Sequence, residues 1–302
     1  MSGFAQDERR MEMRTIAEYN PFAVTVYFLA VAGTTMFSMN PVILVLSLAG
    51  ALSYFFVRNG FREMKSHLAF FLMFLFMALL NPLISHNGVT VLFVMNNNPV
   101  TLEALVYGIA AAAMILAVLY WFRSYSQIMT SDKLLYVFGV LSPRLALILS
   151  MAIRYVPLFG SQVKKVNQAQ KALGLYKEDN LVDSFRGGVR VFSVMVTWAL
   201  ENGIITADSM TARGYGSGKR SHYSTFCFRR GDWILMGISC VLLIVTWIGL
   251  GDFTFNYYPA LKVSALQKTG LIGCISYGLL AFLPVIIEEK ETLKWNCLQS
   301  KI

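Results

Sequence analysis

The residues that most resemble a catalytic motif form a run of glycines ending in basic residues, Gly214-Tyr215-Gly216-Ser217-Gly218-Lys219-Arg220. A phosphate-binding loop needs a glycine five residues before the last one, a serine or threonine after the lysine, and a buried strand in front. Here position 213 is arginine, position 220 is arginine, and the preceding residues are patterned as a helix. We therefore expect a basic linker, and no ATP hydrolysis by this chain.

Other residue types with possible chemistry are scattered. The chain has three widely separated histidines and four cysteines without a partner at metal-ligand spacing: His67, His86, His222, Cys227, Cys240, Cys274 and Cys297. We interpret the cysteines as reduced thiols, and we expect no catalytic residue, no cofactor-binding residue and no metal ligand. Glu103 opens an apolar run, where a carboxylate either lies on a substrate path or is simply favoured at a helix N-terminus.

Two short motifs indicate binding rather than catalysis. Each is an alanine, one further residue and a glycine at the end of a helical pattern: Ala172-Leu173-Gly174 and Ala212-Arg213-Gly214. A glycine just past a helix is its commonest stop, and a cation in the last turn is favoured by the helix dipole, so both motifs can be plain caps. Alternatively, each is a docking knob whose small residues allow close approach and whose cation meets an acidic groove on a cytosolic partner.

The helices that carry these motifs are long and amphipathic. Apolar residues recur every three or four positions from Leu147 to Leu173, and a second stripe repeats in the same way. The second stripe consists of Phe185, Val189, Phe192, Val196, Leu200, Ile204 and Ala207. Such helices are too polar for ordinary membrane spans and too apolar to be solvated alone. We expect them to pack on each other and against the membrane part, with Pro157 kinking the first helix.

The rest of the chain is patterned for a membrane. Hydrophobic residues make up 56% of the 302 residues and charged residues 14%, against about 25% in soluble domains. A hydrocarbon core about 30 Å thick needs roughly 20 helical residues, and the chain has several apolar stretches of this size. They lie near 22–39, 41–57, 68–85, 102–122, 233–250 and 270–287.

The distribution of positive charge gives the orientation. With the N-terminus inside, Lys262 and Lys268 are the only ones of the 26 lysines and arginines that lie outside, as the positive-inside rule requires. The same rule explains the net charge of +9 without nucleic acid as a partner. We predict four transmembrane helices in 1–122, a cytoplasmic coupling domain in 123–232, and two further transmembrane helices and a cytoplasmic tail in 233–302.

The stretch from Ala199 to Tyr215 strongly resembles the signature region of the transmembrane (T) component of energy-coupling factor (ECF) transporters. These are ABC-type importers of vitamins and transition-metal ions, the cobalt, nickel and vitamin permease family. The resemblance covers the layout of the whole chain, and its specific part is 160–216. It implies an all-α integral membrane protein with about six transmembrane helices and two long amphipathic cytoplasmic coupling helices that cross each other.

The resemblance also implies docking residues. In that family each coupling helix ends in an Ala-Arg-Gly-like motif that inserts into one of two ATPase subunits. Carried over by position, the second motif is intact at Ala212, Arg213 and Gly214. The first, Ala172-Leu173-Gly174, has leucine where the family usually has arginine, so either Lys171 supplies the cation or this end docks by apolar packing. We expect unequal roles for the two ends, with Arg213 the stronger.

The implied function is that of a non-catalytic energy-coupling subunit in a prokaryotic cell membrane, with both termini cytoplasmic. Two cytosolic ATPases would bind ATP and Mg²⁺, a small membrane-embedded substrate-binding (S) subunit would capture a vitamin or metal ion, and this chain would hold no cofactor. One alternative is a self-sufficient secondary transporter, which needs paired charges near the bilayer midplane. Another is an intramembrane enzyme, for which we find no nucleophile or acid–base pair. Both leave the basic segment 123–232 unexplained.

Overall fold

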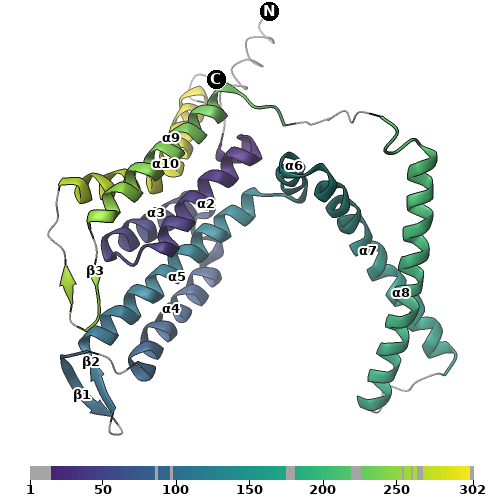
Figure 1. Cartoon of the computed structure of the whole chain (residues 1–302), viewed down its shortest axis with the longest axis horizontal. Coiled ribbons are helices and arrows are strands. Elements are labelled where there is room, and N and C mark those ends of the chain that lie inside the picture. The colour runs from purple at the N-terminus through teal and green to yellow at the C-terminus, as the bar shows by residue number, and fades with distance from the viewer. Residues whose placement is uncertain are drawn as a thin grey trace, which may run out of the picture. The chain divides into compact units, whose positions relative to one another are not determined.

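The computed structural model describes residues 15–85, 88–95, 98–174, 181–218, 226–253, 255–259, 261–263 and 268–299 (Figure 1). The chain divides into two compact units. The first, here called the membrane unit, comprises 1–134 and 226–302, and the second, the helix-pair unit, comprises 135–225. Each unit has its own internal packing.

The membrane unit contains most of the elements. They are η1 (Ile16–Glu18), α2 (Pro21–Phe37), α3 (Pro41–Asn59), η2 (Gly60–Glu63), α4 (Met64–Ile84), β1 (Val91–Met95), β2 (Asn98–Thr101), α5 (Leu102–Ile128), α9 (Arg230–Asp252), β3 (Phe255–Asn256), β4 (Lys262–Val263) and α10 (Lys268–Gln299). The helix-pair unit contains α7 (Pro143–Ala172) and α8 (Leu181–Ala212), and α6 (Ser131–Leu141) leads from one unit into the other. The strands form two small antiparallel hairpins that the sequence analysis did not predict.

Six of the described helices are long and apolar enough to cross a membrane, so the chain is a multi-pass, all-α membrane protein. Five of them correspond to predicted spans and lie in α3, α4, α5, α9 and α10. The predicted span 22–39 is not among them, because α2 has 17 residues and rises about 25 Å at 1.5 Å per residue. The sixth is instead α7, which the sequence analysis placed outside the membrane.

The ends of α2 and α3 are set by local sequence. Asn20 and Asn40 each precede a proline, which is favoured at the first helical position because it has no N–H to leave unpaired. The Asn20 side chain accepts a hydrogen bond from the Phe22 N–H at 3.0 Å, and the Asn40 side chain accepts one from the Val42 N–H at 3.1 Å. These caps explain why α2 begins at Pro21 and α3 begins at Pro41.

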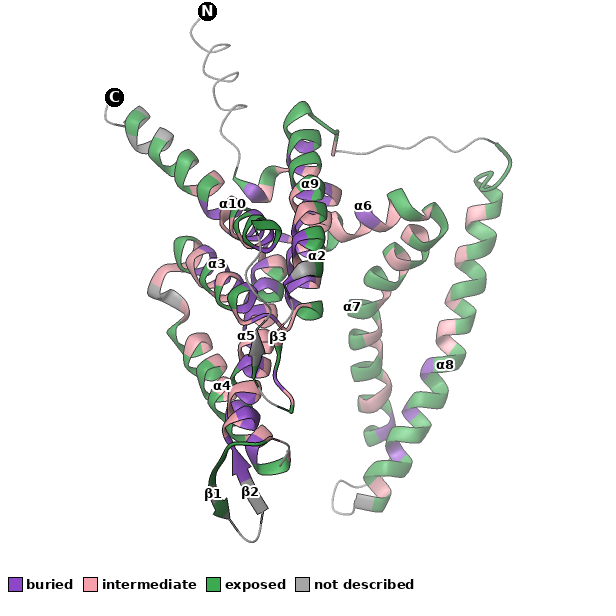
Figure 2. Ribbon diagram, turned by 60° about the vertical axis from the view of Figure 1, so that its left-hand side comes forward, coloured by how far each residue is buried: buried purple, intermediate pink, exposed green. Residues whose placement is uncertain are grey.

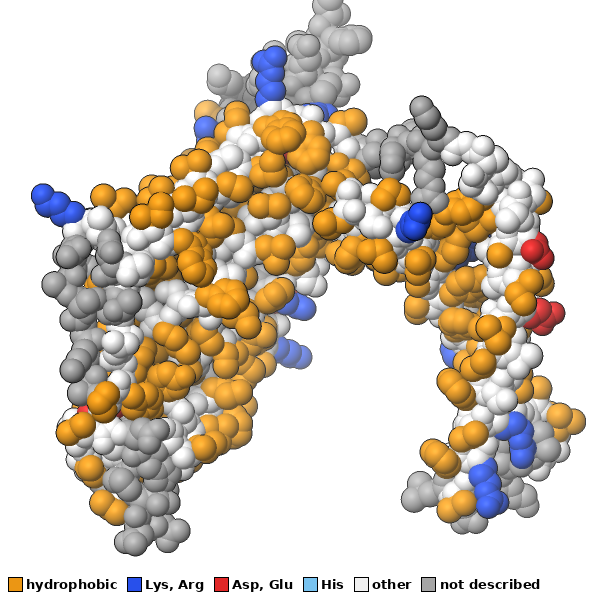
Figure 3. All heavy atoms as spheres, in the orientation of Figure 1, with side chains coloured by type: hydrophobic (Ala, Val, Ile, Leu, Met, Phe, Trp, Pro, Cys, Tyr) orange, Lys and Arg blue, Asp and Glu red, His pale blue; other side chains and the backbone are white. Residues whose placement is uncertain are grey.

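The core of the membrane unit is aromatic. Its largest fully buried side chains include Trp121, Tyr27, Tyr54 and Phe55, which come from α2, α3 and α5 (Figure 2). The helix α10 packs against α9 and α3, while α5 packs against α4, α3 and α2. Hydrophobic side chains cover much of the visible face of this unit, as expected for a surface that meets lipid (Figure 3).

Small residues let these helices approach closely. A Cβ added to Gly249 of α9 would lie 2.5 Å from the Cα of Gly273 on α10, and one added to Gly50 of α3 would lie 2.9 Å from the Ala281 Cβ. Close approach of this kind is the usual way for helices to associate where water does not drive apolar surfaces together.

A polar network joins four helices inside this core. The Thr35 hydroxyl lies 2.7 Å from both the Ser47 hydroxyl and the Tyr277 hydroxyl, and the Trp121 indole N–H donates to the Ser47 hydroxyl at 3.0 Å. These groups come from α2, α3, α10 and α5. Each finds a partner within the protein, as a polar group in hydrocarbon must.

Candidate functional site

The candidate docking motifs form the C-terminal ends of α7 and α8. In α8 the last residue is Ala212, the Gly214 N–H donates to the Thr211 carbonyl at 2.9 Å, and the Tyr215 N–H donates to the Met210 carbonyl at 3.0 Å. Gly214 has a φ of 79°, in the left-handed region that favours glycine. These two bonds are the pair that closes a Schellman cap, so the capping role predicted for this glycine is confirmed.

The end of α7 repeats this geometry in part. Its last residue is Ala172, the Leu173 N–H donates to the Ala169 carbonyl at 3.1 Å, and the Gly174 N–H donates to the Lys171 carbonyl at 3.0 Å. Gly174 has a φ of 68°. This glycine is therefore also a cap, and both helices end abruptly at the residues that the sequence analysis selected.

The side chains at the two ends differ in chemistry. Ala172, Leu173 and Gly174 are all exposed, and Leu173 reaches 73% exposure. Ala212, Arg213 and Gly214 are also exposed, and no ion pair joins Arg213 to any residue that the structure describes. One end thus offers an apolar side chain and the other a guanidinium, each flanked by residues with almost no side chain. Lys171 is exposed beside Ala172.

Direct side-chain contacts join α7 to α8. The Tyr155 hydroxyl lies 2.9 Å from the Thr206 hydroxyl, and the rings of Phe159 and Trp198 meet edge to face with centroids 5.5 Å apart. The two helices run in opposite directions and cross (Figures 1 and 2). Because both motifs lie at C-terminal ends, this antiparallel arrangement places them at opposite ends of the pair.

The face of α8 that is covered differs from the predicted stripe. Its less exposed positions recur at helical spacing: Gly187, Val191, Met195, Trp198, Asn202 and Thr206. The stripe from Phe185 to Ile204 instead points outward, and its large side chains are 41% to 74% exposed. The prediction that the two helices pack on each other is confirmed, but this stripe is not the surface of α8 that contacts α7. Tyr155 and Phe159 pair with Thr206 and Trp198, so the more apolar face of α8 lies outside the contact between the two helices.

On α7 the contact residues Tyr155 and Phe159 belong to the recurrence that was predicted between Leu147 and Leu173. The contact residues of α8 were missed because they are neither uniformly apolar nor charged. The signal that identifies them is their spacing. Tyr155 and Phe159 are four residues apart, as are Trp198 and Asn202, and Asn202 and Thr206. Residues at this spacing share one side of a helix.

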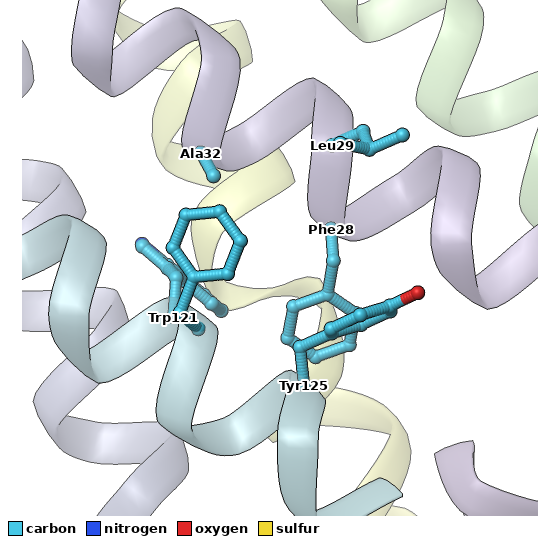
Figure 4. A pocket seen from close by; sticks show the side chains of 6 residues that line it. Phe28, Leu29, Ala32, Trp121 and Tyr125 are labelled. Atoms are coloured by element: carbon cyan, nitrogen blue, oxygen red, sulfur yellow. The ribbon is translucent and has the colours of Figure 1, made fainter. Parts of the chain in front are cut away.

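One cavity of the membrane unit lies between α2 and α5 (Figure 4). It is lined by Phe28, Leu29, Ala32, Trp121, Phe122 and Tyr125. Its volume of about 50 Å³ is well below the roughly 300 Å³ of the smallest usual ligand pockets, and its lining is almost wholly apolar. This cavity is not suited to a vitamin or a hydrated metal ion.

Glu103 lies in the first turn of α5, where the helix dipole favours a carboxylate. Its side chain is 2% exposed, and its carboxylate accepts hydrogen bonds from the Thr90 hydroxyl at 2.8 Å and from the Thr90 N–H at 3.2 Å. Gly88 lies so close that an added Cβ would meet the carboxylate at 2.6 Å. Glu103 therefore fastens the segment before β1 to the start of α5.

Within the described ranges, no group of three or more histidine, cysteine, aspartate or glutamate side chains could hold a metal ion. His67 is bound to the Tyr120 hydroxyl at 2.9 Å, whereas His86 and His222 lie outside the described residues. No disulfide joins any of the four cysteines to another residue that the structure describes. Of the glycine-rich run, positions 214–218 continue from the cap of α8 as turns and a bend, and Lys219 and Arg220 lie outside the described residues.

Comparison with known proteins agrees with this arrangement. The profile of the cobalt transport protein family, CbiQ, matches residues 16–223, which include both capped ends. The chain is 32% identical over 112 residues to the energy-coupling factor transporter transmembrane protein EcfT of Lacticaseibacillus paracasei, covering 36% of this chain and 42% of that protein. It is 30% identical over 104 residues to EcfT 1 of Listeria monocytogenes, covering 34% of this chain and 38% of that protein.

The alignments thus span about two fifths of the length of these curated relatives. The family profile covers more than half of the present chain, and it agrees with the resemblance carried by 160–216. The chain belongs to the CbiQ family of cobalt transport proteins.

Proposed function

We propose that this chain is the energy-coupling transmembrane subunit of an ECF-type ABC importer in a prokaryotic cell membrane, with both termini in the cytoplasm. In this role two cytosolic ATPase subunits bind ATP and Mg²⁺, and the chain transmits their movement to a separate membrane-embedded subunit that binds a vitamin or a transition-metal ion. The chain itself binds no cofactor and catalyses no reaction.

The observation that carries this proposal is the form of the two helix ends. Each is closed by a glycine with positive φ, each presents one exposed side chain between an alanine and a glycine, and the antiparallel pair holds them apart. The helix α8 has 32 residues and is about 48 Å long. Two knobs at opposite ends of a pair of such long helices favour two separate binding sites, one on each of two subunits.

The chemistry of the two ends assigns them unequal roles. The guanidinium of Arg213 suits an acidic groove, where a charge-assisted hydrogen bond contributes more than a neutral one. Leu173 docks instead by burying its side chain, with Lys171 at the rim. Ala172, Gly174, Ala212 and Gly214 let the backbone of each end approach its partner closely.

The outward face of α8 supports a contact with the substrate-binding membrane subunit. Phe185, Phe192, Leu200 and Ile204 are each more than 60% exposed, and an apolar face of this kind marks a contact with protein or membrane. We assign it to the substrate-binding membrane subunit, against which a surface of Phe, Val and Leu can slide without breaking directional bonds.

The test is affinity purification of the tagged chain from detergent-solubilised native membranes. ATPase subunits should co-purify with the wild type and be strongly depleted with Arg213→Glu. The matched control is Arg190→Glu, which makes the same charge change at another exposed arginine of α8 and should retain the ATPases. If no ATPase co-purifies with the wild type, the coupling role is wrong. If Arg213→Glu retains the ATPases, this end is not the main docking contact.

A further inference from the structure

The chain passes twice between its two units, leaving the membrane unit after Leu134 and returning at Phe226. A charged side chain stands near each passage. Lys133 lies one residue before the exit, and Asp232 lies six residues after the return. Both side chains reach the same short segment of the membrane unit, residues 16–20, where they bind Ala17 and Asn20.

Lys133 holds the exit through backbone carbonyl groups. Its ammonium donates to the Ala17 carbonyl at 2.6 Å and to the carbonyl of Ile128, the last residue of α5, at 3.1 Å. The final carbonyls of a helix have no partner within it, and the helix dipole favours a cation there. Partial burial, with a smaller effect from Arg58, lowers the pKa of Lys133, as expected for an ammonium drawn away from solvent.

Asp232 holds the return through backbone N–H groups. Its carboxylate is 1% exposed and accepts hydrogen bonds from the Asn20 N–H at 3.0 Å and from the Arg229 N–H at 2.8 Å. It lies in the first turn of α9, where it satisfies the backbone N–H of Arg229, the residue that precedes the helix. One carboxylate therefore starts α9 and also binds Asn20, the residue that caps α2.

The shared segment is fixed in the membrane unit. Ile16 is 2% exposed and belongs to the main apolar core, and Asn20 is 3% exposed. The return passage is held against α2 by a ring contact as well, since Phe22 and Phe228 meet edge to face with centroids 6.4 Å apart. The segment thus has its own packing, independent of the helix pair.

We propose that residues 16–20 are the common anchor of both connections to the helix-pair unit, and that Lys133 and Asp232 are the positioning residues that transmit movement through it. This inference rests on the proposed coupling function. Two connections tied to one fixed segment cannot shift independently, so a displacement of the helix pair passes into the membrane unit. With one tie removed, the freed connection absorbs part of that displacement.

The experiment compares Lys133→Met and Asp232→Ala with the wild type in the purified complex with its ATPases. Spin labels are placed at Arg190→Cys on α8 and Lys290→Cys on α10, both exposed, after the four native cysteines are replaced by serine. In the wild type, ATP should shift the distance between the labels. In both variants the ATPases should still bind and hydrolyse ATP, while the distance distribution broadens and the ATP-driven shift is lost.

Two variants separate this role from a general loss of stability. Asn40→Ala removes the same kinds of contact at the other end of α2, since Asn40 caps α3 and donates to the Phe253 carbonyl at 3.2 Å, and it should keep the shift. Lys133→Arg retains a donor for the two carbonyls and should restore the shift. If Asp232→Ala does not fold, Lys133→Met decides the matter alone.

The possible failures are distinguishable. An ATP-driven shift of wild-type size in Lys133→Met, or an equal loss in Asn40→Ala, overturns the anchor. Failure of the wild-type chain to bind ATPases, or to respond to ATP at all, overturns the coupling function on which the anchor rests.

Discussion

Gly249 on α9 and Gly273 on α10 face each other across a contact with no room for a side chain, because a Cβ added to Gly249 would lie 2.5 Å from the Gly273 Cα. The nearest atoms belong to backbone, including the Thr269 carbonyl at 2.8 Å, so none of them can rotate away. We predict that Gly249→Ala forces α9 and α10 apart and lowers stability by about 1–3 kcal/mol. Thermal unfolding in detergent measures this loss.

The control is Gly237→Ala, on the same helix, where nothing lies within 4 Å of an added Cβ. It should leave the unfolding temperature unchanged or raise it slightly, because alanine favours a helix over glycine. Equal destabilisation by the two substitutions would mean that the α9–α10 contact is not the cause.

The ring contact between Phe159 and Trp198 should hold the helix pair together. Removing one ring of such a pair costs about 0.5–1.5 kcal/mol beyond the lost apolar burial. We therefore expect Phe159→Ala to accelerate amide hydrogen exchange in α8, measured by mass spectrometry. Phe192→Ala is the control. It removes a ring of α8 that is 70% exposed, and it should leave the amide exchange of α8 unchanged. If amide exchange in α8 of Phe159→Ala is as slow as in the wild type, other contacts are sufficient to hold α7 and α8 together.

The two proposed docking ends should respond differently to substitution of their side chains. Arg213→Leu removes a charged donor, and because a hydrogen bond to a charged group contributes about 1.5–3 kcal/mol, affinity for an ATPase subunit should fall roughly tenfold or more. Leu173→Met keeps an apolar side chain of similar size at the other end and should leave the affinity nearly unchanged. Titration of detergent-purified chain with isolated ATPase gives both dissociation constants. Equal losses in the two variants would contradict the unequal roles.

We expect Glu103 to stabilise the segment before β1, and we do not expect it to take part in moving a charged substrate or ion. Glu103→Ala removes the acceptor for the Thr90 N–H and hydroxyl, so the segment around 88–95 should become a faster site of proteolysis. Glu63→Ala is the control, because it removes a different carboxylate, the one paired with Arg123 at 3.2 Å. Unchanged cleavage in Glu103→Ala would show that the hairpin is held by other contacts.

Local features of this fold could be predicted from the sequence because their causes are local. The Asn40-Pro41 pair marks the start of α3 by itself, since cap and helix are neighbours in the chain. The same holds for the ends of α7 and α8, where Gly174 and Gly214 carry the required backbone conformation. In each case the deciding atoms lie within a few residues of one another.

The orientation of α8 could not be predicted because it depends on a distant surface. Its stripe from Phe185 to Ile204 is the more apolar face, and apolarity alone selects that face for packing. The side of α7 that bears Tyr155 and Phe159 selects Trp198 and Thr206 instead. Likewise, no pattern around Lys133 indicates that its ammonium reaches Ala17, which is 116 residues away in the chain.

The packing behind the two proposed docking ends differs. On α7, Gln170, two residues before Ala172, is buried. On α8, Met210, two residues before Ala212, is only partly buried. The turn that precedes Leu173 is therefore more closely packed than the turn that precedes Arg213. A load applied at the Leu173 end would act on a packed turn, whereas a load at the Arg213 end would act on a turn with less packing to resist it.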